Sequence, residues 1–483
     1  MSFKSKFKEI FSRKEDNIDA MTVKSFERSV NYGKLLARER IKTLLDSASF
    51  HELDMFVHCE SGGMEIPADG VICGTGTINN RPVCIYAQDF TATGSSLGSV
   101  HADKIIKIIK LAIKLQTPLI GICDTGFRNL PEYVDSLAAC GEIASQYMTA
   151  SGKIPLIAVV LGTCKNEAAA IPALSDFVFT TEYIEEDEFS DDNTKKEHHS
   201  EFAPNDVVAH FYAENEKVCF KQIRQLLNYI GTSENAVMPA IENALPPQTP
   251  TSLGEIIPSD YIAPFDVVNL ITAVTDNSYF FECGEYFAKN IVTGFASISG
   301  KKVGIIANQS MSLDGVIDSD AIEKATHFIR CCNMFKLPIV TFVDTPGLPT
   351  ENDPHSRIIY RQSSALFRAY SQADVLKVTV IIRRAYGYGF TLMGSKYVGG
   401  DFVYAFPSTD IAAMSPDKAS AILFAKEISA ARNSEEIKKS KLDEYCSKFA
   451  NPFMAAAGGY IDAVIKPDSC RNAIIHAIKL NYQ

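Results

Sequence analysis

The 483-residue chain lacks the features that mark membrane and secreted proteins. No apolar run reaches the ~18 residues that a membrane-spanning helix needs. Residues 1–16 lack the apolar core of a secretory signal. None of the twelve cysteines stands in a CxxC pair, which excludes redox and zinc motifs of that kind. We therefore expect a cytoplasmic protein with reduced cysteines and without stable membrane insertion.

Excess positive charge and nucleotide-binding motifs are also missing. Forty-seven Lys and Arg face 58 Asp and Glu, and the resulting net charge of −11 argues against nucleic-acid binding. The Gly/Ser/Thr-rich loop at 88–98 lacks the Gly-Lys-Ser/Thr ending of a P-loop. It fits a plain connector as well as a loop that offers backbone N–H groups near a helix start.

Three local patterns each permit two interpretations. Residues 4–14 form a basic amphipathic segment, which fits a packed or frayed helix better than contact with a membrane surface. His198-His199 lies in the acidic insertion 182–201, and no ligand spacing accompanies it, so a solvated loop is favoured over a metal site. Vicinal Cys331-Cys332 on a helical pattern favours core packing over redox chemistry.

One stretch of the chain occurs twice. Residues 118–126 read PLIGICDTG and residues 338–347 read PIVTFVDTPG, 220 residues further on (338 − 118 = 220). Each is an apolar run that begins with Pro and ends with Asp-Thr and a glycine turn, a pattern typical of a buried strand. Asp124 and Asp344 are related by the same offset.

The offset recurs in the neighbouring elements. The matching pairs are residues 78–87 with 298–307, Lys104 with Lys324, and, at an offset of 221, residues 154–161 with 375–382. Register kept through four elements indicates a tandem duplication of one α/β domain. We expect an N-terminal domain at 1–245, a Pro-rich linker at 246–278 and a C-terminal domain at 279–483. A helix is predicted at 205–229, and a turn at 383–390 that corresponds to 163–168.

Taken together, the motifs resemble one family closely: the carboxyltransferase (β) subunit of biotin-dependent acyl-CoA carboxylases. The α subunits of biotin-dependent acyl-CoA decarboxylases share the pattern. The resemblance covers nearly the whole chain, and its motifs are ARERI (37–41), YAQDFT (86–91), GSVH (98–101), ANQ (307–309), FVDTPG (342–347), MGSK (393–396), NPFMAA (451–456) and GYIDAVI (459–465).

This resemblance implies two tandem crotonase-like (ClpP/crotonase) ββα spiral domains of α/β class. It implies a homo-oligomer, usually a hexamer built as a trimer of dimers. In this family the N-domain binds the acyl-CoA, a coenzyme A thioester, and the C-domain binds carboxybiotin on a carrier. The expected partner is a biotin carboxyl carrier or biotin carboxylase subunit. No Ala-Met-Lys-Met biotinylation motif occurs, so biotin must arrive on another polypeptide or domain.

The implied chemistry develops negative charge on oxygen, which aimed backbone N–H groups stabilise. Glycine turns suit this task because no Cβ blocks the approach of a ligand. The catalytic residues that the resemblance implies are Gly126, Phe127, Asn166, Glu167, Ala168, Gly387, Tyr388 and Gly389. The implied binding residues are Arg128, Gly347, Tyr386, Phe390 and Thr391. No metal site is expected.

Both turns depart from the family pattern. The first usually reads Ala-Gly-Gly-Ala and here reads Lys-Asn-Glu-Ala (165–168), and the second usually reads Tyr-Gly-Gly-Ala-Tyr and here reads Tyr-Gly-Tyr-Gly-Phe (386–390). A Glu167 carboxylate about 4 Å from a forming enolate would oppose it by roughly 4 kcal/mol. Two alternatives therefore stay open: a catalytically impaired paralogue that serves assembly or carrier docking, and another crotonase-type hydrolase or isomerase that uses Glu132 and Glu167.

Overall fold

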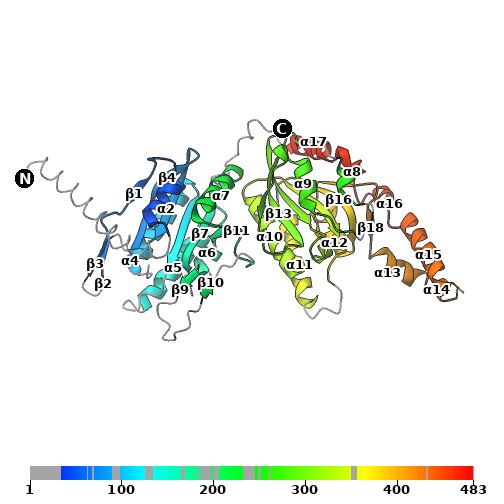
Figure 1. The fold of residues 1–483 in the computed structure, drawn as a ribbon, viewed down its shortest axis with the longest axis horizontal. Coiled ribbons are helices and arrows are strands. Elements are labelled where there is room, and N and C mark those ends of the chain that lie inside the picture. Colours follow the sequence, from blue (N-terminus) through cyan, green and yellow to red (C-terminus); the bar gives the residue numbers. More distant parts are fainter. Residues whose placement is uncertain are drawn as a thin grey trace, which may run out of the picture. The chain divides into compact units, whose positions relative to one another are not determined.

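The chain divides into two compact units, residues 1–236 and 237–483 (Figure 1). The computed structural model describes residues 34–61, 64–67, 70–89, 98–125, 134–164, 169–181, 184–186, 197–199, 206–231, 245–247, 252–258, 260, 263–349, 356–430 and 433–481. Each unit has its own central sheet with helices packed on it. None of the helices within these residues is long and apolar enough to cross a membrane.

The first unit is built on a seven-stranded sheet. Its strands, in spatial order, are β1 (His51–Leu53), β4 (Val71–Ile78), β5 (Arg81–Gln88), β6 (Leu119–Thr125), β7 (Leu156–Cys164), β8 (Phe177–Thr181) and β11 (Phe211–Ala213). Two small hairpins pair β2 (His58–Ser61) with β3 (Met64–Pro67) and β9 (Ile184–Glu186) with β10 (Glu197–His199). The helices are α2 (Ala37–Leu44), α4 (Ser99–Leu115), α5 (Val134–Ala150), α6 (Ala170–Ala173) and α7 (Glu216–Tyr229).

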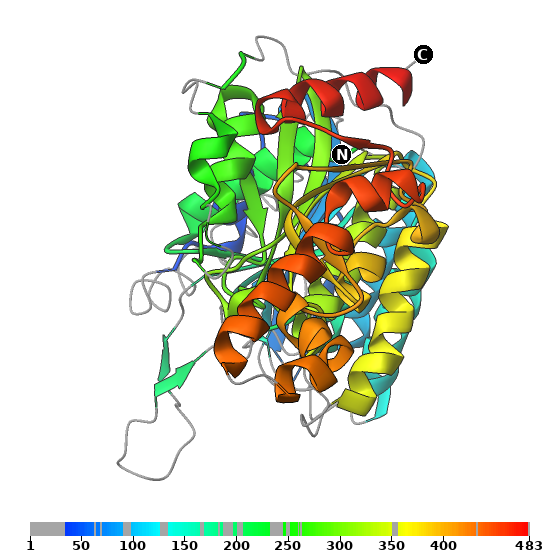
Figure 2. The same cartoon turned by 90° about the vertical axis from the view of Figure 1, so that its right-hand side faces the viewer.

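The second unit repeats this plan with an eight-stranded sheet. Its strands are β12 (Phe281–Cys283), β13 (Ile291–Ile298), β14 (Lys301–Asn308), β15 (Ile339–Thr345), β16 (Lys377–Tyr386), β17 (Phe402–Ala405) and β19 (Ala463–Val464), and β18 (Asp410–Ala412) pairs with the end of β16. Its helices are α8 (Leu253–Ile256), α9 (Val267–Val274), α10 (Ser319–Met334), α11 (Ser356–Gln372), α12 (Tyr388–Leu392), α13 (Pro416–Leu423), α14 (Ala425–Ala430), α15 (Ser434–Lys448), α16 (Pro452–Ala457) and α17 (Cys470–Asn481). Short 3-10 turns are η4 (Asp276–Ser278), η5 (Leu313–Gly315), η6 (Lys396–Val398) and η7 (Pro467–Ser469). Figure 2 shows α13 to α15, in orange, as a group of helices in this unit.

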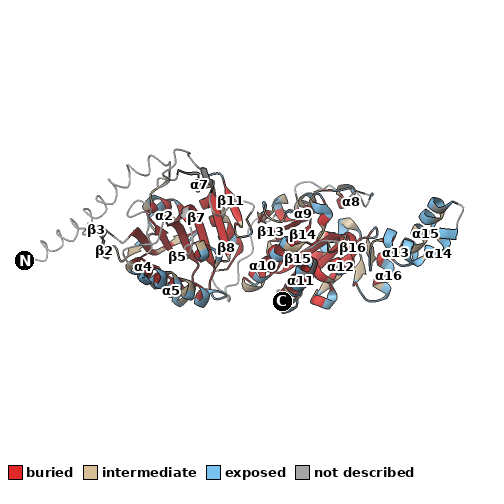
Figure 3. Cartoon of the chain, turned by 90° about the horizontal axis from the view of Figure 1, so that it is seen from below, coloured by how far each residue is buried: buried red, intermediate tan, exposed pale blue. Residues whose placement is uncertain are grey.

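Strand register confirms the tandem duplication. The parallel pairing of β5 with β6 sets Cys84 opposite Leu119, and that of β14 with β15 sets Gly304 opposite Ile339. Both partners are thus shifted by 220 residues (304 − 84 = 339 − 119 = 220). The sequence predicts this because β6 and β15 are continuous apolar runs, and every residue in each strand is buried (Figure 3). Parallel strands covered on both faces read as such runs.

The two repeats also share polar contacts at equivalent positions. Lys104 donates its ammonium to the Val71 carbonyl at 2.6 Å, and Lys324 donates to the Ile291 carbonyl at 2.8 Å. Each contact fastens the helix that precedes the repeated strand to the start of the β-hairpin. Buried lysines are rare unless their donors are satisfied. Both halves of the duplication keep a buried lysine whose ammonium donates to a backbone carbonyl.

Carboxylates bind the two hairpin turns in the same way. Asp46 accepts from the backbone N–H groups of Asn79 and Asn80, and Asp276 accepts from those of Ser299 and Gly300. All four turn residues have positive φ (52°, 62°, 55° and 75°), as a two-residue hairpin loop requires. The equivalence of these contacts shows that the turns, as well as the strands, were duplicated.

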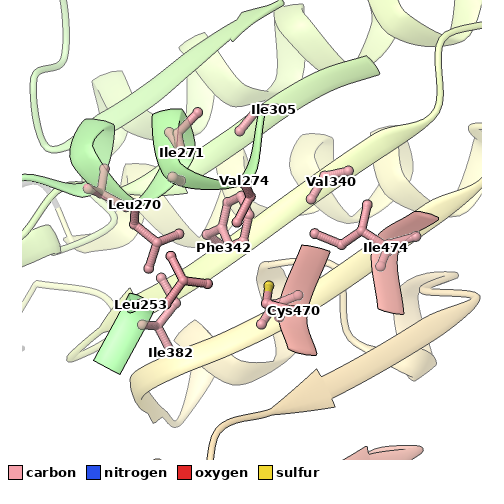
Figure 4. Close-up of a cluster of buried hydrophobic side chains, with 14 of the residues drawn as sticks. Leu253, Leu270, Ile271, Val274, Ile305, Val340, Phe342, Ile382, Cys470 and Ile474 are labelled. Carbon is pink, nitrogen blue, oxygen red and sulfur yellow. The ribbon is translucent and has the colours of Figure 1, made fainter. Parts of the chain in front are cut away.

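Each unit has its own apolar core. In the second unit, Leu270 and Ile271 of α9 pack with Val340 and Phe342 of β15 and with Ile474 of α17 (Figure 4). In the first unit, α4 and α5 cover one face of the sheet, and their inward residues are fully buried. Truncating such a buried side chain to Ala typically costs about 2–5 kcal/mol, so each sheet is held by its own helices.

Two of the predicted elements differ in the structure. The segment 205–229 is not one helix: β11 extends the sheet in parallel with β8, and α7 begins only after Asn215, whose side chain accepts from the Val218 N–H. Burial of alternate residues on β11 gives a period of two, which outweighs helix propensity. The described parts of 246–278 contain α8 and α9, which pack into the second core.

Candidate functional site

The repeated aspartates mark the same place in both units. Asp124 and Asp344 lie near the carboxyl ends of β6 and β15, where the register to the next strand shifts between Cys123 and Thr125 and between Val343 and Thr345. Ligands of open parallel sheets bind beyond the carboxyl ends of the strands. The bulges therefore lie beneath the turns that are expected to carry the chemistry.

In the second unit, β16 runs on to Tyr386 and leads directly into a sharp turn. Arg383 and Arg384, predicted to lie in this turn, belong to the strand instead. Gly387 has φ 51° and ψ −123°, a conformation open to glycine, and its N–H donates to the Ala412 carbonyl at 2.9 Å. Helix α12 begins at Tyr388. Pairing with β18 thus fixes where the chain leaves the sheet.

Gly389 lies directly against the turn that follows β15. A Cβ on Gly389 would stand 2.6 Å from Thr345 Cγ2 and 3.1 Å from Gly347 Cα. Gly347 itself has φ 107° and is buried. The backbones approach too closely for any larger residue at 389, as expected of a cradle in which main-chain atoms face a ligand.

Two backbone N–H groups at this turn lack an acceptor within their own helix. Tyr388 and Gly389 are the first two residues of α12, and N–H groups at a helix start have no acceptor within the helix. The Gly347 N–H, by contrast, donates to Thr345 Oγ1 at 3.1 Å. The available donors are therefore those of Tyr388 and Gly389, while Gly347 supplies close packing.

An aromatic cluster, Tyr388, Tyr360 and Phe367, stands beside these donors. The Tyr388 ring lies 6.3 Å from Tyr360 and 6.5 Å from Phe367, both on α11. Tyr388 and Tyr360 are 49% and 54% exposed, which leaves their faces open to a flat apolar ring. Phe390 is half-buried, and the Thr391 hydroxyl donates to the Gly387 carbonyl at 3.4 Å, so Thr391 stabilises the turn.

Asp410 is a site residue that the sequence did not reveal. It lies on β18 opposite Arg384, and the Tyr386 hydroxyl donates to its Oδ2 at 3.4 Å. Burial raises the pKa of Asp410 to about 6, although the Tyr386 hydrogen bond lowers it. Burial and the nearby Asp410 carboxylate also raise the pKa of Tyr386. Only strand pairing brings these groups together, because 24 residues separate them in the chain.

Two arginines surround Asp344. Arg383 donates to Asp344 Oδ2 from Nε at 3.1 Å and from Nη2 at 2.6 Å, and Arg384 Nε donates to Oδ1 at 2.9 Å. Asp344 has no exposed surface and Arg383 is 2% exposed. A charged pair this deeply buried is stable only when its remaining groups are satisfied. The Arg383 guanidinium also donates to the Ala263 carbonyl and stacks over Phe265 at 4.7 Å.

The first unit holds its aspartate differently. Arg40 of α2 donates to Asp124 Oδ2 at 2.8 Å, to the Leu161 carbonyl at 3.1 Å and to Glu216 at 2.7 Å. Burial alone lowers the pKa of Arg40, and the two carboxylates raise it overall. Gly162 occupies the place that corresponds to Arg383 (383 − 162 = 221), and a Cβ there would lie 2.0 Å from Asp124 Oδ1. No side chain at 162 can therefore reach this carboxylate, and its described cations, Arg40 and the more distant Lys34, come from α2 and the residues just before it.

The residues predicted for the acyl-CoA side lie outside the described residues. These are Gly126, Phe127, Arg128, Asn166, Glu167 and Ala168. Glu132, named for the hydrolase or isomerase alternative, also lies outside the described residues. Their chain neighbours are placed: Thr125 ends β6 opposite Cys164, which ends β7. Within the described part of the chain, no group of three or more His, Cys, Asp or Glu side chains is arranged to hold a metal ion.

Comparison with known proteins identifies the family. Residues 28–186 and 200–483 match the model of the carboxyl transferase domain. The chain is 40% identical to the methylmalonyl-CoA decarboxylase subunit alpha of Veillonella parvula over 476 residues, covering 95% of this chain and 92% of that protein. It is 39% identical to the propionyl-CoA carboxylase beta chain of Cereibacter sphaeroides over 473 residues, covering 92% and 90%.

The fold matches as well. The transcarboxylase 12S structure, described as a hexamer with methylmalonyl-coenzyme A bound, superposes with a TM-score of 0.92 at 31% identity, covering 99% of this chain and 95% of that chain. The crotonase-like architecture implied by the sequence is thereby confirmed. The chain belongs to the carboxyl transferase family and is a carboxyltransferase component that moves a carboxyl group between biotin and an acyl-CoA.

Proposed function

We propose that this carboxyltransferase acts on a short acyl-CoA of the propionyl-CoA and methylmalonyl-CoA pair. The observation that carries the proposal is the shared acyl pair of its relatives: one is named for methylmalonyl-CoA, another for propionyl-CoA, and each aligns over at least 90% of its own length. The match to a transcarboxylase with methylmalonyl-coenzyme A bound agrees with this assignment. None of these comparisons supports a non-catalytic paralogue.

The biotin side is assigned to the turn after β16. The Tyr388 and Gly389 N–H groups would face the ureido oxygen of biotin, and the close approach of Gly347 to Gly389 provides the cradle. Carboxybiotin, when bound, supplies the carboxyl group and, once that group has left, the base for the acyl α-proton. The aromatic cluster would cover the ring system and keep water from it. Tyr386, Phe390 and Thr391 support this turn.

The acyl-CoA side is assigned to the turns after β6 and β7. Backbone donors at Gly126, Phe127, Asn166, Glu167 and Ala168 would stabilise the thioester enolate, and Arg128 would bind the coenzyme. One such donor contributes about 10²–10³ in rate. The chain continues into these turns directly from Thr125 and Cys164, which pair at the carboxyl edge of the sheet.

A transfer assay tests the proposal. Purified protein, methylmalonyl-CoA and free biotin should yield propionyl-CoA and carboxybiotin, both measured by chromatography. We expect kcat/KM for methylmalonyl-CoA to exceed that for 3-methylglutaconyl-CoA at least about tenfold, since small pockets discriminate against extra carbons. The reverse order would refute the acyl assignment. No turnover of any thioester by an intact oligomer would support the impaired-paralogue alternative.

We further propose a hexamer that works with a separate biotin carrier in the cytoplasm. The hexameric description of the matched transcarboxylase supports the assembly. The eleven cysteines whose side chains are described are free thiols, as expected in a reducing compartment. Light scattering on the purified protein and fractionation of the source cells test these two statements separately.

A further inference from the structure

The turn η5 has an unusual backbone conformation. Leu313, Asp314 and Gly315 have φ values of 46°, 54° and 72° in succession. Side chains other than glycine rarely adopt this left-handed region. Runs of such residues persist only where their surroundings hold them, and they cluster at functional sites.

Arg384 holds this turn with two of its nitrogens. Its Nη1 donates to Asp314 Oδ2 at 2.9 Å, and its Nη2 donates to the Asp314 carbonyl at 3.2 Å. The third nitrogen, Nε, donates to Asp344 Oδ1 at 2.9 Å. One planar guanidinium therefore joins the left-handed turn to the end of β15, a geometry that a lysine ammonium does not reproduce.

The same turn is fastened to Gly347 in the turn after β15, against which the proposed biotin turn packs. Thr345 Oγ1 donates to the Gly315 carbonyl at 2.7 Å and accepts from the Gly347 N–H at 3.1 Å. Two residues after Gly315, the Ile317 N–H donates to the Gly347 carbonyl at 2.9 Å. The Gly347 carbonyl is thus held by the segment that follows η5, and its N–H by the Thr345 hydroxyl, which itself binds η5. Gly389 packs directly against Gly347.

We infer that Arg384 is a positioning residue for carboxyl transfer, which fixes the Gly347 backbone through η5 and Asp344 and so sets the place of the Gly389 N–H. The inference rests on the proposed function, because it assumes that biotin binds at this turn. Arg384 does not contact the substrate itself: it is 6% exposed, and each of its three side-chain nitrogens donates within the protein. Asp314 is the accessible partner, with 54% of its side chain exposed.

The charges around the clamp are balanced. Two cations, Arg383 and Arg384, face two carboxylates, Asp344 and Asp314. Arg383 alone gives Asp344 two hydrogen bonds. After removal of Arg384, the buried Asp344 carboxylate is therefore still paired with Arg383. A variant at 384 is therefore expected to fold, and its effect should appear in the geometry of η5.

A mutant cycle tests the inference with free biotin and methylmalonyl-CoA as substrates. We expect Arg384→Met to lower kcat/KM for biotin about tenfold or more, with KM for methylmalonyl-CoA within about twofold of wild type. Asp314→Ala should give part of this loss. The double variant should have the same kcat/KM for biotin as Arg384→Met, because both changes remove the same contact between Arg384 and Asp314. Asp314→Asn keeps an acceptor oxygen and the backbone carbonyl, so it should stay near wild type.

Arg471→Met is the matched control. Arg471 binds Asp276 at 2.5 Å in the same unit but belongs to α17, so its loss should lower urea stability and leave both KM values unchanged. Wild-type biotin kinetics in Arg384→Met would overturn the inference, as would an equal biotin defect in Arg471→Met. A wild-type protein inactive with biotin would instead count against the proposed function.

Discussion

At the scale of single residues, the packing of the proposed biotin turn depends on where a Cβ is absent. Gly389 is such a position because Thr345 and Gly347 leave no room beside it. The family pattern usually places Gly and Ala at positions 388 and 389, whereas this chain has Tyr388 and Gly389. The glycine was recognisable from the sequence, but the contact that requires it was not.

Gly389→Ala should therefore damage the biotin side. The added methyl would meet Thr345 Cγ2 at 2.6 Å, which pushes the turns apart, and we expect kcat/KM for biotin to fall at least about tenfold. Gly141→Ala in α5 is the control: nothing lies within 4 Å of its Cβ position. That change should leave kinetics intact and stabilise the protein by about 0.5–1 kcal/mol in urea unfolding. Equal kinetics in the two variants would contradict the cradle.

A second residue-scale prediction concerns pH. Burial raises the pKa of Asp176 from 3.8 to about 7, although its hydrogen bond from the Leu156 N–H lowers it. Because the folded-state pKa lies above the unfolded value, the stabilisation from this group is present below about pH 4 and is lost as pH rises through about 7.

The variant Asp176→Asn keeps an acceptor for Leu156 and removes the titration. It should be more stable than wild type at pH 8, and this advantage should shrink at pH 5. Urea unfolding at the two pH values measures the difference. An advantage that does not depend on pH would show that Asp176 is charged at both values or neutral at both.

At the scale of elements, the equivalent aspartates of the two units pair with arginines from different elements, a helix in the first unit and a strand in the second. Arg40 reaches Asp124 from α2, ahead of the repeated segment, while Arg383 reaches Asp344 from within β16. Gly162 explains the difference, since it leaves no space for a side chain at the corresponding place. Helix α2 is thus an integral part of the first unit.

Arg40→Met should destabilise the first unit strongly. It would leave Asp124 buried, with the more distant Lys34, 3.6 Å away, as its remaining cation among the described residues. Breaking one side of a buried ion pair typically costs about 3–5 kcal/mol. Lys107→Met is the comparison, because its pair with Asp54 is exposed and such pairs contribute at most about 1 kcal/mol. Similar urea midpoints for both variants would contradict the anchoring role.

The elements also show how far sequence reasoning extends. Continuous apolar runs and the 220-residue offset were enough to predict β6, β15 and the duplication, since burial on both faces leaves a plain pattern. The turn at 383–390 was placed too early, because Arg383 and Arg384 look like loop residues until Asp344 and Asp314 are seen to neutralise them. Asp410 joined the site only through the pairing of β18 with β16.

At the scale of the whole molecule, two separate cores predict two unfolding units. Among the residues that the structure describes, the buried clusters of the first unit and the cluster of the second unit have no member in common. Hydrogen exchange should therefore show that Arg40→Met speeds exchange in β6 and β7, whereas Arg471→Met speeds it in β13 and β14, next to the Asp276 that it binds. Uniform acceleration across both units by either variant would indicate a single cooperative structure.

The duplicated lysines have a consequence for chemical labelling. Lys104 and Lys324 are 2% and 7% exposed, and each ammonium is bound to backbone carbonyls. Burial lowers the pKa of Lys324 to about 8, although nearby acidic groups raise it, so its amine would be an efficient nucleophile if a reagent could reach it. Acylating reagents should modify surface lysines within minutes and these two only when their unit opens. The acylation rate of each buried lysine therefore reports how often its own unit opens. Mass spectrometry can measure both rates on the unsubstituted protein.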